Sequence, residues 1–384
     1  MLTITVLADL AVGMTFRGIP FLAHDVLHLS TEVILLLTMS FGVCYVPTAL
    51  VSHRLCVALG ERRVLAGSLW LEAGACLLTA AFGNHPQTWV LFACMGLLGA
   101  SQGFKWPVIE SYISAGRGAA AQARAVGSFN LAWAGAFPVA VFLAGPLIDW
   151  WPPALFLVPA LIDGAMLAMT WTLPLRPAHL PEGHPERPDG TAILRWRRLL
   201  LAGRVTNLLS QCSTSALAAL MPMVYASLGI SVFWGTGLSG VLDLVRFLAF
   251  LVLQAWTGWH GRRSPLVLSM AALVVGFFMI VLGGNVAVVL AGEVLFGVAV
   301  AMTYYAALYY AMLAQNATVQ AGGVHEALIG LGSVVGPASG LLSMKLVAIW
   351  GAAALGMAAG MSPLFLLCLG ASAVSLLRTG RRNR

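Results

Sequence analysis

One polar stretch, PLRPAHLPEGHPERPDGTAILRWRR from Pro174 to Arg198, divides an otherwise apolar chain. The 384 residues are 60% hydrophobic and only 9% charged, and their mean hydropathy is +0.89. Soluble domains carry about 25% charged residues. We therefore expect an integral membrane protein in which this proline-rich stretch links two membrane-embedded parts.

Apolar runs recur on both sides of the stretch, and each approaches the roughly 20 residues that a helix needs to cross a bilayer. Six runs precede the stretch and six follow it. The predicted spans are 3–23, 32–52, 64–83, 88–113, 122–147, 154–173, 200–226, 232–257, 264–283, 286–313, 322–346 and 350–377.

The sequence thus predicts an all-α membrane protein with an N-terminal six-helix bundle (1–173), a cytoplasmic linker (174–199) and a C-terminal six-helix bundle (200–384). Arginines gather in alternate connections, as at Arg62–Arg63 and Arg262–Arg263, while the opposite connections have neither arginine nor lysine. By the positive-inside rule, we expect a multi-pass protein of the cell membrane with both termini in the cytoplasm. The net charge of +7 then reports orientation, and we expect no nucleic-acid partner.

The two halves match each other at an offset near 200 residues. GERRVL from Gly60 aligns with GRRSPL from Gly261, and the fourth and tenth spans align with Gly99 against Gly297. Six helices followed by six more restore the same orientation. The halves are therefore predicted to be parallel repeats about an axis along the membrane normal.

With these features the chain resembles the major facilitator superfamily of secondary transporters over essentially its full length. The loop motif of that family is present in degraded form as HRLCVALGERR, His53–Arg63, where Gly60 and Arg62 fit the motif. Val57 stands where the family has an aspartate, and the second copy keeps only Gly261 with Arg262 and Arg263.

The resemblance implies a transporter, not an enzyme, whose two bundles rock around a site near the middle of the membrane. It implies that the first, fourth, seventh and tenth spans line the central cavity. We expect a small organic solute, possibly anionic or amphiphilic, proton coupling, no cofactor or metal, and a monomer in the lipid bilayer. A facilitative or sodium-coupled carrier is an alternative within transport, and a membrane receptor or scaffold without flux is one outside it.

The fourth span, with GFKWPVIESYISAG from Gly103 to Gly116, places Lys105 and Glu110 inside an apolar helix. Five residues correspond to about 140° around a helix, so the two charges should have different partners. We expect Lys105 to face the cavity. For Glu110 an ion pair with Arg117 or Arg124 is an alternative to proton coupling.

In the eighth span, Asp243 and Arg246 are three residues apart and share a helix face. The pair either neutralises itself to allow burial, or Asp243 takes a proton and releases Arg246 to the solute. Repeat alignment places the run Thr303–Tyr305 against the run Lys105–Pro107. One wall would then be charged, and the other would be aromatic and hydroxylated.

Three sets of candidate residues follow from polar groups within the spans and from the linker-side loops. The candidates for binding solute are Arg17, Lys105, Trp106, Asn130, Gln211, Arg246, Tyr304 and Tyr305. The candidates for carrying the coupled proton are Asp9, Glu110, Asp243 and Glu326. The candidates for gating are Arg62, Arg63, Pro107 and His325.

Overall fold

The computed structural model describes residues 1–182, 184–186, 190–230, 238–350, 360 and 370. Before the linker these residues form α1 (Leu2–Phe21), α2 (Thr31–Leu59), α3 (Glu61–Ala80), α4 (Thr88–Ser114), α5 (Ala119–Trp150) and α6 (Ala154–Thr170). After the linker they form α7 (Gly190–Ser227), α9 (Val241–Ala255), α10 (Ser264–Leu282), α11 (Val286–Ala314) and α12 (Val319–Trp350).

The predicted all-α membrane fold is confirmed. Within the described ranges every predicted span coincides with a helix, and no strand occurs. Seven of the described helices are long and apolar enough to cross a membrane, and α6 is a shorter apolar helix. The last predicted span, 350–377, and the start of the eighth, 232–237, lie almost entirely outside the described residues.

The linker is shorter than predicted, because α7 begins at Gly190 and not near residue 200. The segment TAILRWRR is charged, yet alanine, leucine and arginine are good helix formers. Its charges mark the end of the membrane-embedded part, and they do not end the helix.

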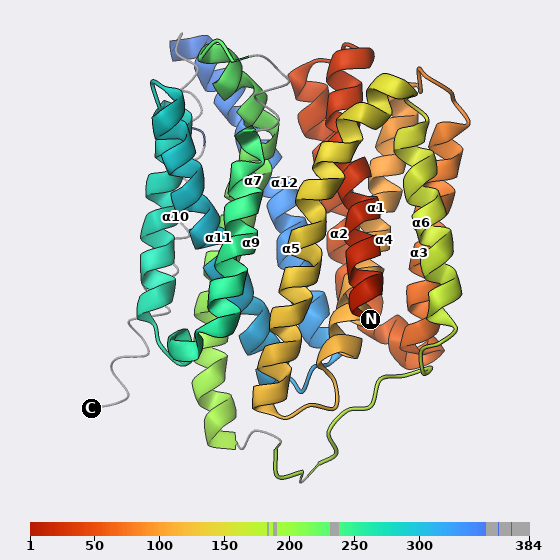
Figure 1. Cartoon of the computed structure of the whole chain (residues 1–384), viewed down its shortest axis with the longest axis vertical. Coiled ribbons are helices and arrows are strands. Elements are labelled where there is room, and N and C mark those ends of the chain that lie inside the picture. Colours follow the sequence, from red (N-terminus) through yellow and green to blue (C-terminus); the bar gives the residue numbers. More distant parts are fainter. Residues whose placement is uncertain (183, 187–189, 231–237, 351–359, 361–369, 371–384) are drawn as a thin grey trace.

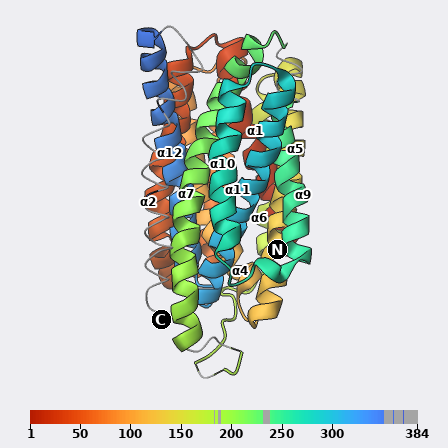
Figure 2. The ribbon, with the colours of Figure 1, turned by 90° about the vertical axis from the view of Figure 1, so that its left-hand side faces the viewer.

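The helices stand side by side and follow one long direction (Figures 1 and 2). In Figure 1, α1–α4 and α6 lie on one side and α7, α9, α10 and α11 on the other. Between them α2 packs against α12, and α5 packs against α9. The linker runs along the lower end of the molecule in Figure 1, which we call the linker side.

Equivalent glycines of the two predicted repeats make equivalent contacts. A Cβ at Gly99 of α4 would clash with the backbone of Phe41 in α2, and one at Gly297 of α11 would lie 2.8 Å from the Leu242 carbonyl oxygen in α9. Small residues allow such close helix approach in membranes. The alignment of Gly99 with Gly297 therefore agrees with how the fourth and tenth spans pack.

The loops after the second and eighth spans also match. Gly60, which ends α2, has φ of +85°, and Gly261 has φ of +73°. This left-handed region strongly favours glycine. The same backbone turn therefore occurs at corresponding points of the two halves.

The linker is held against the ends of helices from both halves. The Tyr112 hydroxyl of α4 donates a hydrogen bond to the Pro174 carbonyl oxygen at 2.6 Å. Asn316, between α11 and α12, donates through Nδ2 to the Leu180 carbonyl oxygen at 3.1 Å. The linker is thus a bridge between the two halves on this side.

Candidate functional site

Three charged side chains from opposite halves meet where α1 approaches α9. Arg17 Nη2 lies 3.8 Å from Asp243 Oδ2, and Arg246 Nη2 lies 2.8 Å from Asp243 Oδ1. The side chains of Arg17, Asp243 and Arg246 are at most 20% exposed. We call these three residues the central ion cluster. The predicted Asp243–Arg246 pair is confirmed, and it gains a second arginine from the other half.

Two aromatic rings of α5 cover the arginines of the central ion cluster. The Arg246 guanidinium carbon lies 4.7 Å from the centre of the Trp133 ring, and that of Arg17 lies 5.3 Å from the Phe137 ring. Such placements are attractive cation–π contacts. One helical turn before Trp133, Asn130 accepts a hydrogen bond from the Trp133 indole at 3.2 Å. α5 therefore presents an amide and two rings on one face to the cluster.

Tyr304 of α11 extends this aromatic wall. Its ring centre lies 4.9 Å from Trp133 and 6.1 Å from Phe250 of α9. The next residue, Tyr305, packs against Trp259 at 5.3 Å and belongs to a group of rings closer to the linker side. Tyr304 thus belongs to the aromatic wall near the central ion cluster, together with Trp133 and Phe250. Tyr305 lies outside this wall, next to Trp259.

Asp9 is a second buried carboxylate near the central ion cluster. It lies on α1, and its Oδ2 has no hydrogen-bond partner. The charges of Arg246 and Asp243 act on it. Asp243 is therefore the carboxylate that contacts both arginines, and Asp9 is a further buried carboxylate on α1.

Lys105 is paired within the N-terminal half. Its Nζ lies 2.5 Å from Glu72 Oε2 of α3, and both side chains are fully buried. Ser101 and Gln102 donate hydrogen bonds to the same oxygen at 2.8 and 3.0 Å. The predicted exposure of Lys105 to a cavity is therefore not what the structure shows, because Glu72 supplies a partner that the sequence could not locate.

The separation of Lys105 from Glu110 agrees with the helix geometry, since each finds different neighbours. Glu110 is buried, and the charged group that acts on it is the Glu326 carboxylate. The alternative ion pair with Arg117 or Arg124 does not form among the described residues. The cause is α12, which crosses α4 so closely that a Cβ at Gly322 would meet the Glu110 carboxylate.

Glu110 instead lies with His325 and Glu326 of α12. One ligand atom from each of these three buried residues lies within 4.8 Å of the others. The Tyr45 hydroxyl of α2 donates to Glu326 Oε2, and the Tyr304 ring lies 5.0 Å from the His325 ring. We call Glu110, His325 and Glu326 the linker-side trio.

The remaining candidates lie apart from both groups. Gln211 of α7 is 3.4 Å from Asn207 Oδ1 on its own helix, and Trp106 packs edge-on against Phe129 at 6.1 Å. Arg62 donates through Nη1 to the Leu173 carbonyl oxygen at 3.1 Å, which fixes the start of the linker.

Arg63 and Pro107 complete the predicted gating set. Arg63 is exposed at the start of α3. Pro107 lies inside α4, which continues as a helix through it, and a Cβ at Gly322 would lie 3.0 Å from its Cα. Pro107 is thus at the contact of α4 with α12, where a gate between the halves would be.

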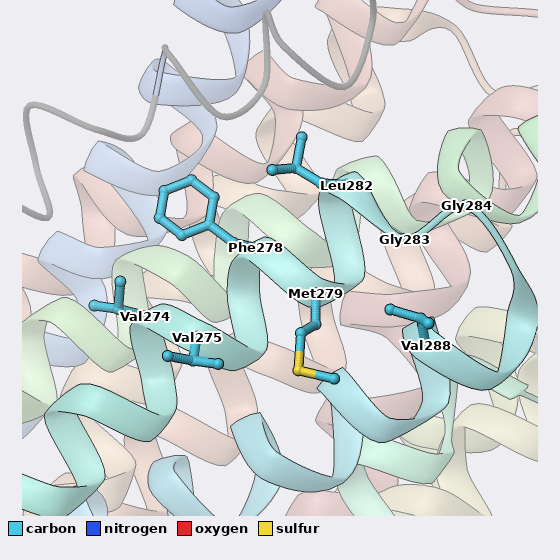
Figure 3. A pocket seen from close by; sticks show the side chains of 8 residues that line it. All are labelled: Val274, Val275, Phe278, Met279, Leu282, Gly283, Gly284 and Val288. Carbon is cyan, nitrogen blue, oxygen red and sulfur yellow. The ribbon is translucent and has the colours of Figure 1, made fainter.

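An apolar hollow of about 410 Å³ lies between α10 and α11 (Figure 3). Its lining residues are Val274, Val275, Phe278, Met279, Leu282, Gly283, Gly284 and Val288. None of these side chains carries a charge or a hydrogen-bonding group, so the hollow offers nothing to recognise a polar solute. The candidate site is the central ion cluster with its aromatic wall.

Sequence reasoning missed Trp133, Phe137 and Tyr45. The signal for the first two was present, because Trp133 and Phe137 are four residues apart and Asn130 precedes them by one turn, which places all three on one face. Tyr45 is separated from Glu326 by 281 residues, and the pairing depends on how α2 crosses α12.

Comparison with known proteins gives one family and a common fold. A family model described as Major Facilitator Superfamily matches residues 1–337. The crystal structure of the human organic anion transporter MFSD10 (TETRAN) has a TM-score of 0.69 and 19% identity, and the match covers 97% of this chain and 98% of that chain. No curated protein sequence matches significantly.

Two further solved structures are similar. The Escherichia coli fucose:proton symporter FucP has a TM-score of 0.63 and 10% identity, over 96% of this chain and 98% of that chain. The nucleoside transporter NupG has a TM-score of 0.62 and 13% identity, over 98% of this chain and 97% of that chain. At these identities the similarity shows the fold alone.

Proposed function

Since the chain belongs to the Major Facilitator Superfamily, we propose that it moves a small organic anion across the membrane by proton-coupled alternating access. As expected for its family, the chain is a multi-pass membrane protein and a secondary transporter of solutes, and it is not an enzyme.

The central ion cluster is the observation that carries the proposal. Arg17 comes from the half before the linker, and Asp243 and Arg246 come from the half after it. Two guanidinium groups contact a single carboxylate in a largely buried place. A guanidinium binds carboxylates and phosphates through paired hydrogen bonds, so release of either arginine from Asp243 creates a binding point for an anionic group.

Proton coupling follows from the same contacts. When Asp243 takes up a proton, it loses the charge that holds Arg17 and Arg246, and both become available to the solute. When the solute leaves, Asp243 can give up the proton and take the arginines back. Asp9, a buried carboxylate of α1, is the second candidate for this role. The solute and the proton would therefore both bind at the central ion cluster between the halves, either together or in place of each other.

The aromatic wall indicates the rest of the solute. Trp133, Tyr304 and Phe250 form a buried group of rings next to Arg246. Such rings bind apolar or planar groups. We therefore propose an amphiphilic anion, with its charged group at the arginines. MFSD10, which shares this fold, is itself an organic anion transporter.

We also propose that the protein acts as a monomer without a cofactor, in the cell membrane with the linker side and both termini in the cytoplasm. The charge distribution supports this orientation. Light scattering of the purified protein and protease access to the linker in inverted vesicles test these points.

The transport proposal is tested by flux in proteoliposomes containing the full chain. A panel of aliphatic and aromatic carboxylates is offered with and without an imposed pH gradient. We expect gradient-driven accumulation by the parent, exchange without gradient-driven accumulation by Asp243→Asn, and loss of both by Arg246→Gln. Arg54→Gln, which changes an exposed arginine of α2, should behave like the parent.

Other results favour the alternatives. Flux that ignores the pH gradient indicates a facilitator, and flux that follows a sodium gradient indicates a sodium-coupled carrier. Binding of a carboxylate without any flux indicates a receptor or scaffold.

A further inference from the structure

The linker-side trio contains more unpartnered polar atoms than a buried group of protein atoms ordinarily has. Both carboxylate oxygens of Glu110 and both ring nitrogens of His325 lack a hydrogen-bond partner. The exposed fractions of Glu110, His325 and Glu326 are 1%, 0% and 2%. Buried polar atoms are nearly always satisfied by a partner, so these residues require a ligand or another explanation.

A shared proton satisfies only part of this set. A proton between Glu110 and Glu326 would join one oxygen from each carboxylate. It would leave the second oxygen of Glu110 and both nitrogens of His325 without partners. A single divalent cation would accept one lone pair from each of the three residues at once and would neutralise the two carboxylates. It would therefore also supply a partner for one nitrogen of His325, which the proton does not.

The geometry and the ligand types fit such a cation. Ligand atoms at about 2.0–2.2 Å from a tetrahedral zinc ion lie about 3.3–3.6 Å apart, and the three atoms here are within 4.8 Å of one another. Side-chain rotations that bring these atoms closer by about 1 Å would complete the site. One imidazole and two carboxylates are ligands suited to zinc and similar first-row divalent metals, whereas calcium and magnesium prefer oxygen alone.

The surrounding residues support the same assignment. The Tyr45 hydroxyl of α2 donates to Glu326, which would orient that carboxylate as outer-shell partners do in metal sites. Tyr304 of α11 covers the imidazole. Arg204 of α7 places a positive charge near His325, which opposes a cation there, but it makes no ion pair with the trio among the described residues.

We propose that Glu110, His325 and Glu326 bind a zinc-type divalent cation that joins α4 to α12 and holds the linker side closed. The sequence analysis predicted no metal, because the adjacent pair His325–Glu326 matches no metal-binding motif. The third ligand comes from the other half of the chain. The trio is buried, so the ion must reach it while the halves are apart, and bound ion then opposes their separation.

The proposal is tested by metal binding to the purified full chain, without reference to any solute. Co²⁺ is titrated as an optical probe, and Zn²⁺ is used to displace it. We expect one Co²⁺ per chain with visible ligand-field bands and no thiolate charge-transfer band, since the ligands are nitrogen and oxygen. Zn²⁺ should raise the thermal midpoint of the parent.

Variants distinguish the trio from other metal-binding residues. His325→Ala and Glu110→Gln should each weaken Zn²⁺ binding by about 100-fold or more, because even loss of an outer-shell partner costs 10–100-fold. Tyr45→Phe keeps all three ligands and should weaken binding by about 10-fold or more. His260→Ala, which changes a half-buried histidine outside the trio, should bind like the parent.

Closure is measured with a cysteine at Ser111, whose hydroxyl donates to the Ala317 carbonyl oxygen at 3.0 Å across the same contact. In a background without the native cysteines, Zn²⁺ should slow its labelling unless His325 is replaced. The proposal is overturned if the parent binds no Zn²⁺ or Co²⁺, or if His325→Ala binds as tightly as the parent. If metal ions have no effect on the parent and Glu110→Gln stabilises it, the trio instead shares a proton. That result would equally overturn the metal proposal.

Discussion

Arg17 of α1 and Asp243 of α9 lie 3.8 Å apart across the contact between the two halves. Asp243 also contacts Arg246 on its own helix at 2.8 Å. The carboxylate therefore has one partner that moves with it and one that does not. Rocking of the halves must break the first contact, whereas the second can persist until Asp243 takes up a proton.

The contact between Arg17 and Asp243 should appear as energetic coupling. Arg17→Gln and Asp243→Asn are each expected to lower the free energy of unfolding, and the double variant should cost less than their sum. Directly contacting residues typically couple by about 0.5–3 kcal/mol. Thermal unfolding in detergent of the parent, the two single variants and the double variant measures this double-mutant cycle. The changes in the free energy of unfolding caused by Arg54→Gln and Asp243→Asn should be additive, which makes this pair the control. If the changes caused by Arg17→Gln and Asp243→Asn are also additive, the contact is contradicted.

The buried pair of Lys105 and Glu72 predicts an asymmetric cost. Lys105→Met leaves a buried carboxylate uncompensated and should destabilise the chain by about 3–5 kcal/mol. Lys105→Met with Glu72→Gln should recover a large part of this loss, since the side-chain amide is neutral and still accepts hydrogen bonds. Unfolding measurements decide the matter, and equal stability of the single and double variants would exclude a charge pair.

The same double variant separates structure from solute binding. If Lys105 only neutralises Glu72, carboxylate flux should recover together with stability. A stable double variant without flux would show that Lys105 contacts the solute, as the sequence predicted.

The ring of Trp133 should stabilise Arg246 through its π face. Trp133→Leu is expected to cost about 0.5–2 kcal/mol for the cation–π contact, beyond the loss of buried area. Trp133→Phe should retain much of that contact. Repeating the comparison in Arg246→Gln isolates the effect, because the difference between leucine and phenylalanine should then shrink. An unchanged difference would mean that Trp133 acts through packing alone.

Gly323 of α12 should be needed for closure of the linker side. A Cβ at this position would lie 2.5 Å from the Ala49 carbonyl oxygen of α2, closer than such contacts tolerate. Gly323→Ala should therefore separate α12 from α2 and speed labelling of a cysteine at Ser111. Gly74→Ala is the control, because nothing lies within 4 Å of its added Cβ. Similar labelling of both variants would contradict the close contact.

His260 should make stability depend on pH. Its ring stacks on Tyr309 at 4.5 Å and meets Trp259 edge-on at 4.3 Å, and burial lowers the pKa of His260. The unfolded chain then binds a proton more readily, so stability contributed by neutral His260 is lost as pH falls below the unfolded value of about 6.5.

Replacement of His260 by phenylalanine, whose ring does not titrate, tests this dependence. His260→Phe should show a smaller fall in thermal midpoint between about pH 7.5 and about pH 5.5 than the parent. His85→Phe, in the exposed loop before α4, should keep the dependence of the parent.

The fold was predictable because it depends on composition and period. Long apolar runs and matched glycines at Gly99 and Gly297 suffice to indicate helices and their repeat. The start of α7 was missed because the arginines before residue 200 were interpreted as the end of a membrane span. Arginine and leucine are also good helix formers, so the helix includes these residues.

The site was predictable only where its contacts are local. Asp243 and Arg246 are three residues apart, and their pair was foreseen. Arg17 with Asp243, Lys105 with Glu72, and Glu110 with Glu326 depend on which helices cross, and one sequence does not contain that information. The family pattern pointed to the first, fourth, seventh and tenth spans, whereas the central ion cluster uses the first and eighth and is covered by rings of the fifth.

Three of the hydrogen bonds that hold the described part of the linker end on its backbone oxygens. Tyr112, Arg62 and Asn316 donate to the carbonyl groups of Pro174, Leu173 and Leu180. Every residue type offers the same carbonyl, so these three anchors do not depend on which side chain stands at the accepting position. Arg176 is different, because its own side chain donates to the Val57 carbonyl oxygen at 2.8 Å. A reporter residue can consequently replace Leu180 without loss of an anchor, whereas replacement of Arg176 removes one.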